Sequence, residues 1–538
     1  MKDDKNGTVP SGLGRRQLMK LGAGAVAAIS TLGGKTAIAQ EEEEGGGAGR
    51  GGREVSRPEG VVVRTGAGYK NDSGRIYGNG PMDETSRRLV SFVTKYTESD
   101  LNDSLTKALG NTMLDTVAAA AAGFDSDAGR LAARVARMNQ SEMKSTVFGY
   151  GVVTNPESAA FANSAMVRNT DFNDGDPGHG GHNSVIIPGI LAIGEAVHAT
   201  GAQVMIATAI GYEILNGLGA AGRGRRDVPA GAGGWDGPWE GLATALAAGK
   251  LLKLDEDRLA NALSIALVPH LPMQVSHVGA LSMWKGCHSA MGCRNGVYAA
   301  LLAREGFTGP AQPFEERGGI YDHMGPFKEL KLPVNSDGSF AIETFRFKRF
   351  PAEGNSQATL LSAINPIREF TKASDIESIN LQVSFGTWQE IGDPPKWDPR
   401  NRETADHSFA YIMAVALTDG EVYLNSFDEK RYLQDTAIRD LMARVTVEVD
   451  PEFDREPQGR TRITTITKSG KKNVQEVHHE PPITHEEILA KYDRVCSYMK
   501  VPDAQRDRAR EAWLNLKNVR DIAVPVRDLA KFGRALPA

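Results

Sequence analysis

The chain has few cysteines, few aromatic residues and no strong excess of charge of either sign. Its 538 residues include 3 cysteines, 7% aromatic residues and 62 Lys+Arg against 67 Asp+Glu, a formal net charge of -5. Three cysteines are too few for a disulfide scaffold. The slightly acidic balance excludes nucleic acid as an expected partner, because nucleic-acid binders usually carry a strongly basic domain. Charged residues make up 24% of the chain, which is typical of a soluble protein rather than a polytopic membrane protein.

The first 39 residues resemble a twin-arginine export signal. Arg15 and Arg16 precede a weakly apolar run over 21–34, and Ala37 and Ala39 flank one position as a signal peptidase requires. The run is shorter than the ~20 residues of a membrane span, so no stable membrane anchor is expected. A basic N-terminal helix is the alternative. The pattern predicts export by the twin-arginine machinery into the periplasm or out of the cell.

Residues 40–83 are predicted to be a flexible linker. They begin with four consecutive glutamates at 41–44 and a glycine-rich run over 45–52. Like charges repel, and glycine resists ordering. No lysine followed by serine or threonine comes after the glycine run, so it is not a phosphate-binding loop.

The hydrophobic pattern predicts a mainly α fold with one smaller α+β domain. Over 100–123, apolar residues recur four apart, which builds one helical stripe. The signal stays largely helical to about Gly306, and Gly309-Pro310 and Gln312-Pro313 then break the helix. Strand-like runs follow at 378–385, 444–449 and 461–468, the last with a return run to His478 that indicates a hairpin. Thr484 and Glu487 form a capping-box pattern that starts a further helix. We therefore expect a large helical domain over 84–337, an α+β lid over 338–479, and C-terminal helices over 480–538 that return to the helical domain.

The densest polar cluster is the segment from Asp171 to Ser184. It holds three aspartates and two histidines within twelve residues. A solvated loop whose Asn183 or Ser184 caps the next helix explains the end of the segment but not the histidines. A calcium loop fails, because its position 12 would be His182 rather than glutamate. A transition-metal site and metal-free acid–base catalysis remain open; in the latter, a histidine and a carboxylate move protons near neutral pH.

A second informative segment runs from Gln274 to His288. Lys285 lies there between Trp284 and a run of small residues that starts a helix. Such a lysine can hold a carboxylate or donate a proton. Cys287 and Cys293 follow in the same small-residue stretch and are expected to be buried free thiols without a catalytic role; the third cysteine is Cys496.

Taken in order, these segments resemble the MmgE/PrpD family, which contains 2-methylcitrate dehydratase, cis-aconitate decarboxylase and an iminodisuccinate epimerase. The resemblance covers nearly the whole chain from about Glu84 onward. The matching stretches are 171–174 through 182–184, Pro188, 234–236, 279–287, 294–297, 306–310, 350–353 with 356–357, and 397–399 with 402–408. The pieces at 282–287 and 402–408 look most like the methylcitrate dehydratase branch.

The resemblance implies a large all-helical domain, a smaller α+β lid and a homodimer. It also implies a site between the domains that needs no metal and no organic cofactor. The implied chemistry is removal of a proton next to a carboxylate with loss of water, or a related reaction. Such a site needs cations for the carboxylates, a base for the carbon acid and an acid for the departing hydroxyl.

Site residues are carried over position by position. His182 is the implied proton-transferring group, Asp171 holds or tunes it, and Lys285 anchors a carboxylate or acts as the acid. Tyr411 matches a tyrosine that reaches the site from the lid. Asp236, His277 and Gln357 are implied substrate-binding residues.

Three departures from the family pattern affect the pocket. Gly237 occupies a position where histidine is expected, Gly354-Asn355 replaces an aromatic residue and a histidine, and His277 replaces an arginine. The family substrate is therefore not assumed.

From the resemblance we predict an exported lyase that dehydrates a small hydroxy- or polycarboxylate of unspecified carbon skeleton. A related decarboxylase or epimerase, a catalytically degenerate carboxylate-binding protein, and a metal-dependent hydrolase that uses the Asp171–His182 loop are the alternatives.

Overall fold

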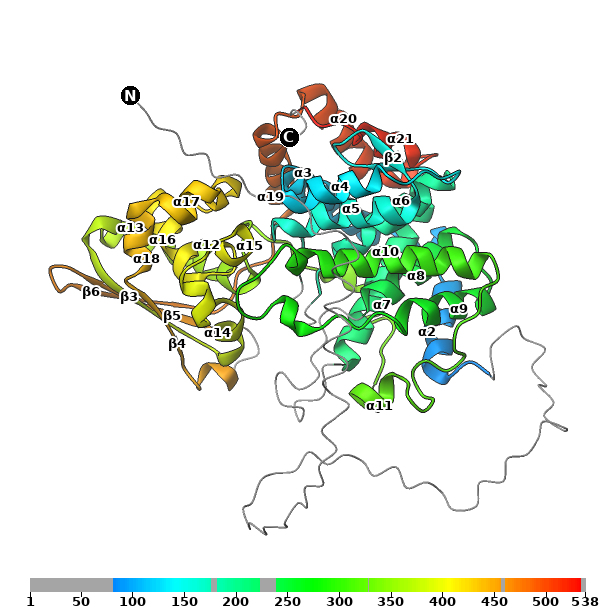
Figure 1. Ribbon diagram of the computed structural model, residues 1–538, viewed down its shortest axis with the longest axis horizontal. Helices are drawn as coiled ribbons and strands as arrows, with labels where there is room; N and C mark the ends of the chain where they lie inside the picture. Colours follow the sequence, from blue (N-terminus) through cyan, green and yellow to red (C-terminus); the bar gives the residue numbers. More distant parts are fainter. Residues whose placement is uncertain (1–80, 176–180, 223–238, 328, 456–459, 534–538) are drawn as a thin grey trace, which may run out of the picture. The chain divides into compact units, whose positions relative to one another are not determined.

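The computed structural model describes residues 81–175, 181–222, 239–327, 329–455 and 460–533. The predicted export signal and all but the last three residues of the predicted linker lie outside these ranges. Over them the protein is mainly helical (Figure 1).

The larger domain is built of helices that pack closely on one another. Their bounds are α2 Glu84–Lys95, α3 Asp103–Gly123, α4 Asp127–Ala136, α5 Pro156–Asn169, α6 Ile187–Ala196, α7 Gly201–Gly222, α8 Glu240–Leu251, α9 Glu256–Leu267, α10 Trp284–Arg304 and α11 Ile320–Met324. Asn102 and Asn155 cap α3 and α5 by accepting a hydrogen bond from a first-turn amide. A Cβ added at Gly296 would lie 2.4 Å from the Gly241 carbonyl oxygen, so α10 and α8 approach too closely for any side chain there. Small residues on these helices therefore allow the close packing.

Helix α7 shows that this domain has a thick apolar interior. By length and composition it could cross a membrane, but 89% of its most apolar stretch is buried inside the protein. It is therefore a core helix. The hairpin of β1 (Ser145–Val147) and β2 (Val152–Thr154) was not anticipated from the sequence, because strands of three residues leave no periodic signal.

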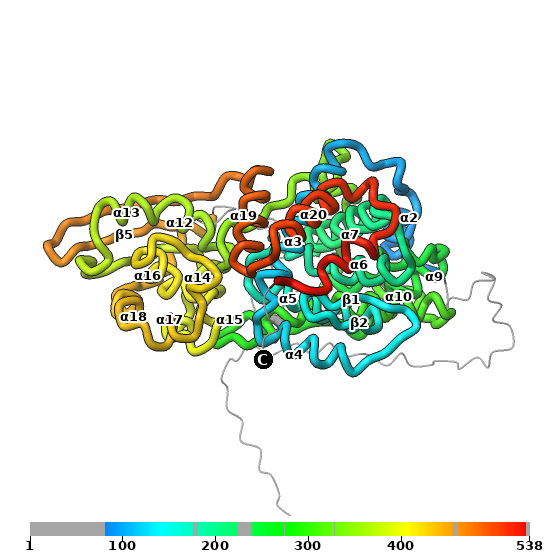
Figure 2. The backbone as a smooth tube through the Cα atoms, turned by 90° about the horizontal axis from the view of Figure 1, so that it is seen from above, coloured from blue at the N-terminus to red at the C-terminus, as the bar shows by residue number. Residues whose placement is uncertain are grey.

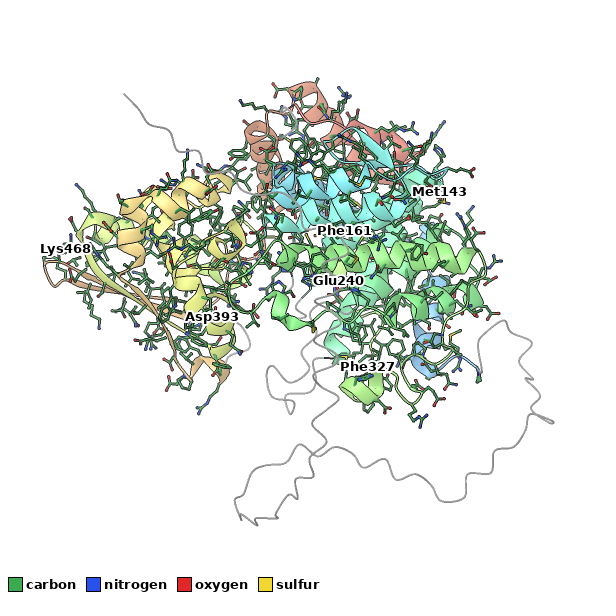
Figure 3. The ribbon with its side chains drawn as sticks, in the orientation of Figure 1. Met143, Phe161, Glu240, Phe327, Asp393 and Lys468 are labelled. Atoms are coloured by element: carbon green, nitrogen blue, oxygen red, sulfur yellow. The ribbon has the colours of Figure 1, made fainter. Side chains whose placement is uncertain are left out.

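The smaller domain contains a four-stranded sheet with helices along one face (Figure 1). The strands are β3 Ile376–Val383, β4 Val445–Val449, β5 Thr461–Thr467 and β6 Lys472–Val477, in the order β4-β3-β5-β6. β4 pairs parallel with β3, and the other pairs are antiparallel. The helices are α12 Gln357–Ser362, α13 Ile364–Phe370, α14 Phe385–Ile391, α15 Arg402–Ala405, α16 Phe409–Asp419, α17 Glu429–Gln434 and α18 Thr436–Met442. The three predicted strands and the hairpin are confirmed; Figure 3 marks Lys468 in the hairpin turn, at the far end of this domain.

The C-terminal helices pack against the larger domain. They are α19 His485–Tyr498, α20 Asp503–Leu514 and α21 Ala523–Asp528, and α19 and α20 lie along α3 (Figure 2). The capping box of Thr484 and Glu487 begins α19 as predicted. The buried apolar residues form two main cores, one in the smaller domain and one in the larger domain that also includes Tyr423 and Leu424. The chain crosses between the two cores from Phe347 to Phe350. Lys348 lies at this crossing.

Candidate active site

Asp171 is a buried carboxylate that three cations approach. It follows the C-terminus of α5 with a left-handed backbone (φ 51°), a conformation that aspartate adopts more readily than most residues. Its Oδ1 accepts a hydrogen bond from Arg168 and lies 3.8 Å from the Lys285 Nζ. Its Oδ2 accepts from the Lys348 Nζ at 2.8 Å. Asp171 therefore neutralises charge from α5, from α10 and from the crossing into the smaller domain.

Lys285 lies where a loop of the larger domain docks on the smaller domain. The Leu281 amide donates to the Thr404 hydroxyl at 3.0 Å, and the Asn401 side chain donates to the Leu281 carbonyl at 2.7 Å. These bonds bring Lys285, in the first turn of α10, to 3.4 Å from the Asp406 carboxylate. Two sequence segments that carry the resemblance thus meet in space.

His407 adds an imidazole to the same group. Its Nδ1 lies 2.7 Å from Asp406 Oδ1 and 3.5 Å from Lys285 Nζ. Its ring stacks 6.3 Å from that of His277, which in turn meets His288 edge-on at 5.1 Å. Burial, followed by the charge of Lys285, holds the pKa of His407 well below its usual value. His407 is therefore a neutral imidazole near pH 7.

His182 is half-buried and held in one tautomer. Its Nδ1 lies 2.6 Å from the Asp174 carbonyl oxygen, which can only accept, so Nδ1 carries the proton and Nε2 keeps a lone pair. Burial, followed by the charges of Arg168 and Lys348, holds the pKa of His182 well below its usual value. The imidazole is thus in the form that can accept a proton, beside cations that can hold an anion.

Asp174 anchors the loop that carries His182. Its carboxylate accepts hydrogen bonds from the Ser184 amide at 3.1 Å, from the Ser184 hydroxyl at 2.5 Å and from the Tyr212 hydroxyl at 2.8 Å. Burial raises the pKa of Asp174 to about 6, against these hydrogen bonds. Its partners bind it on both oxygens, so its role is to fix the loop against α7.

The charged cluster consists of Arg168, Asp171, His182, Lys285, Lys348, Asp406 and His407. Lys491 of α19 fixes the backbone on both sides of it. Its Nζ donates to the Asp115 carboxylate at 2.6 Å, to the Phe172 carbonyl at 2.6 Å and to the Lys348 carbonyl at 3.0 Å. The C-terminal helices therefore hold the segments that carry Asp171 and Lys348 at a fixed separation.

Both lysines of the cluster have a lowered pKa, so their charge can change closer to neutral pH than that of an exposed lysine. Burial lowers the pKa of Lys285 to about 8, although Asp406 acts in the opposite direction. Burial and the charge of Arg168 hold the pKa of Lys348 well below its usual value. An anion placed here would stabilise the protonated lysines, so its binding would be coupled to the uptake of a proton.

The remaining predicted residues lie elsewhere or outside the described ranges. Tyr411 is buried in the core of the smaller domain, where its hydroxyl donates to the Ser426 carbonyl at 2.5 Å. The Gln357 amide accepts from the backbone of Arg349 and Phe350 and donates to the carbonyls of Phe350 and Ala352. In this arrangement both side chains are engaged by the protein itself. Asp236, like Gly237 beside it, lies outside the described residues, and the roles of Asp236, Tyr411 and Gln357 stay predictions.

The sequence reasoning did not select four members of the cluster. These are Arg168, Lys348, Asp406 and His407. Asp406 and His407 stood inside a quoted stretch, so the resemblance could have suggested them. Arg168 and Lys348 are 180 residues apart in a chain with 62 Lys+Arg, and only the tertiary structure distinguishes them.

Two further observations concern other kinds of site. Cys287 and Cys293 are free and buried, as predicted, and so is Cys496, where burial raises the pKa of the thiol to about 11. Over the described ranges, no group of three or more His, Cys, Asp or Glu side chains is placed to hold a metal ion.

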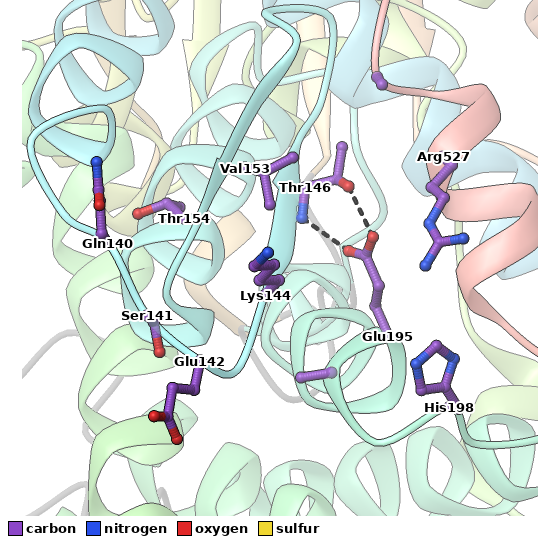
Figure 4. Close-up of a pocket in the computed structure, with 12 residues that line it drawn as sticks. Gln140, Ser141, Glu142, Lys144, Thr146, Val153, Thr154, Glu195, His198 and Arg527 are labelled. Atoms are coloured by element: carbon purple, nitrogen blue, oxygen red, sulfur yellow. Dashed lines mark hydrogen bonds between the residues drawn. The ribbon is translucent and has the colours of Figure 1, made fainter.

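A cavity of about 670 Å³ opens on another part of the larger domain (Figure 4). It lies beside β1, the end of α6 and α21. The carboxylate of Glu195 in its wall accepts hydrogen bonds from the Thr146 amide and hydroxyl, both at 2.7 Å. That carboxylate is used to hold β1, and the cavity contains none of the cluster residues.

Comparisons with known proteins concern the sequence of the chain as a whole. The family models for the MmgE/PrpD N-terminal and C-terminal domains match residues 87–333 and 350–516. A cis-aconitate decarboxylase of Aspergillus terreus is 26% identical over 411 residues, which cover 70% of this chain and 82% of the relative. The human cis-aconitate decarboxylase is 25% identical over 378 residues, 65% of this chain and 74% of the relative. A 2-methylcitrate dehydratase of Salmonella typhi is 26% identical over 351 residues, 61% of this chain and 71% of the relative. The chain belongs to the MmgE/PrpD family.

Proposed function

We propose that the protein is a lyase that dehydrates a small hydroxy- or polycarboxylate by acid–base catalysis. One observation carries the proposal: Arg168, Lys285 and Lys348 converge on Asp171, and the charges of Arg168 and Lys348 act on His182, whose Nε2 carries a lone pair. Three basic groups face two buried carboxylates, Asp171 and Asp406, so the fully protonated group keeps one positive charge in excess, which suits an anionic substrate.

The steps follow from the chemistry of these groups. His182 Nε2 takes the proton from the carbon next to a substrate carboxylate, and the electron pair of that C–H bond forms the alkene as the C–O bond breaks. Lys285 has a pKa of about 8, so it can donate a proton to the departing hydroxyl, which leaves as water. Arg168 keeps its charge throughout and holds a carboxylate.

Decarboxylation is the second candidate function. The relatives from Aspergillus terreus and human are both named cis-aconitate decarboxylase. The same cations would stabilise the charge that develops when CO₂ leaves. A degenerate family member that binds a carboxylate without turnover is the alternative from a different class, and Gly237 supports it.

The test is to incubate the purified protein with a panel of hydroxy- and polycarboxylates in deuterated water and to follow each by NMR. Alkene signals support dehydration, release of CO₂ supports decarboxylation, and deuterium exchange without either supports epimerisation. A ligand that raises the melting temperature without any exchange supports the binding protein and refutes the lyase. His182→Ala should abolish turnover with the fold intact, while His479→Ala, a change at an exposed histidine, should leave activity unchanged.

We also propose that the twin-arginine segment exports the folded protein to the periplasm or beyond, and that it acts as a homodimer. Replacing Arg15 and Arg16 with lysine should retain the protein in the cytoplasm on cell fractionation. Analytical ultracentrifugation should give about twice the mass of one 57.8 kDa chain.

A further inference from the structure

Lys285 has two carboxylates within reach, and the nearer one belongs to the smaller domain. Asp171 lies 3.8 Å from its Nζ, but Asp171 is also paired with Arg168 and with Lys348. Asp406 lies closer, at 3.4 Å. Because Asp171 is shared by three cations, it cannot compensate Lys285 fully.

Asp406 is not shared in this way. It is fully buried, and among the described residues its one ion pair is with Lys285, while His407 contacts it as a neutral imidazole. Its Oδ2 is buried and accepts no hydrogen bond from the described residues. A buried carboxylate is stable as an anion only when a cation compensates it, so Asp406 and Lys285 depend on each other.

His407 completes the arrangement without adding charge. Its Nδ1 proton points to Asp406 Oδ1 at 2.7 Å, because the other tautomer would set a lone pair against the carboxylate. The ring therefore orients the carboxylate toward Lys285.

We propose that Asp406 and His407 are a positioning pair, supplied by the smaller domain, that keeps the buried Lys285 side chain protonated and aimed at the substrate. This inference rests on the proposed function for its catalytic meaning but not for its physical test. The other charged or titratable groups that act on Lys285 or on the pair are Arg168 of α5, Asp171 of the following loop, Glu403 of α15, Lys348 at the domain crossing and His277. Of these, Asp171 and Glu403 favour the protonated lysine, whereas Arg168 opposes it. Asp406 has the strongest favourable effect.

The direct test is the protonation of Lys285 in the full-length protein. Lysine labelled with ¹³C and ¹⁵N is titrated by NMR, and the Lys285 signal is identified by its loss in Lys285→Arg. The wild type should titrate near pH 8. Asp406→Asn removes an opposite charge at short range, so the pKa should fall by about 1–3 units. An unchanged pKa in a folded Asp406→Asn protein overturns the proposal.

Two further variants keep the test decisive. Glu403→Gln removes a charge whose effect on Lys285 is weaker than that of Asp406, so it should lower the same pKa by less than Asp406→Asn does. If Asp406→Asn does not fold, no fall in Glu403→Gln overturns the proposal. Thr404→Val removes the hydrogen bond to Leu281 without a change in charge, so it should leave the pKa of Lys285 in place.

Once a substrate is found, the pH profile of kcat/KM separates positioning from structure. Activity that needs protonated Lys285 falls as the pH rises through its pKa. The alkaline limb of the profile should move to lower pH in Asp406→Asn, and activity should recover on acidification. Thr404→Val should instead lower activity by the same factor at every pH. If no substrate is found, the proposed function fails, but the NMR titration still decides this inference.

Discussion

Asp171→Asn is the sharpest test of the charge arrangement at the centre of the protein. Asparagine has nearly the same shape as aspartate, and it also tolerates the left-handed backbone at this position. The change therefore removes charge without backbone strain. Arg168, Lys285 and Lys348 then lose a buried counter-ion.

The expected loss of folding stability has two parts, one from Arg168 and one from the lysines. Removing one partner of a buried ion pair costs about 3–5 kcal/mol, because a charge is left uncompensated. Arg168 cannot escape this cost, since its guanidinium stays protonated. The lysines can escape by losing a proton, because burial already lowers the pKa of Lys285 to about 8.

The loss should therefore depend on pH. Without Asp171 the pKa of Lys285 falls below about 8, and each unit of that fall is worth about 1.4 kcal/mol. The part of the destabilisation that comes from Lys285 is fully present at pH values below the lowered pKa, where Lys285 is charged in both the variant and the wild type. It vanishes above pH 8, where the lysine is neutral in both. The free energy of unfolding of Asp171→Asn should thus lie further below that of the wild type at pH 6 than at pH 9.

Urea unfolding followed by tryptophan fluorescence and circular dichroism measures the difference at both pH values. Asp127→Asn is the matched control, because Asp127 pairs with Arg130 on the exposed surface of α4 and should contribute little. A variant as stable as the wild type refutes the idea that Asp171 compensates buried charge. If the variant loses the same free energy of unfolding at pH 6 and at pH 9, the contribution assigned to the lysines is refuted.

The fold could be predicted from the sequence where local signals and tertiary packing agree. The stripe of leucines in α3, the capping box of α19 and the hairpin of β5 and β6 each carry a periodicity or a cap that holds without knowledge of the rest. The short elements of the smaller domain, such as α14 and α17, were missed, since helices of six or seven residues gain their stability from packing rather than from their own pattern.

The candidate site shows the same division. His182, Asp171 and Lys285 stand in unusual local surroundings, so the sequence pointed to them. Lys348 and Arg168 have ordinary neighbours in sequence, and their importance comes only from the approach of distant segments. Conversely, Tyr411 and Gln357 match the family pattern by position, but a position in a pattern does not fix where a side chain points. The hydrogen bonds of both are made inside the smaller domain.

Two further predictions follow from the buried groups outside the cluster. In Tyr411→Phe the Ser426 carbonyl loses a buried donor, so the protein should be destabilised by about 1–3 kcal/mol in thermal or urea unfolding. The alkaline limb of the pH profile should not move, because the hydroxyl is bound within the core of the smaller domain; a shifted limb would place Tyr411 in the mechanism instead. Burial raises the pKa of the thiols of Cys287 and Cys293 to about 12, so thiol reagents should react only as fast as the protein opens. Rapid labelling of the folded protein, quantified by mass spectrometry against a urea-unfolded control, would show that the close packing around α10 opens readily, contrary to the burial of both cysteines.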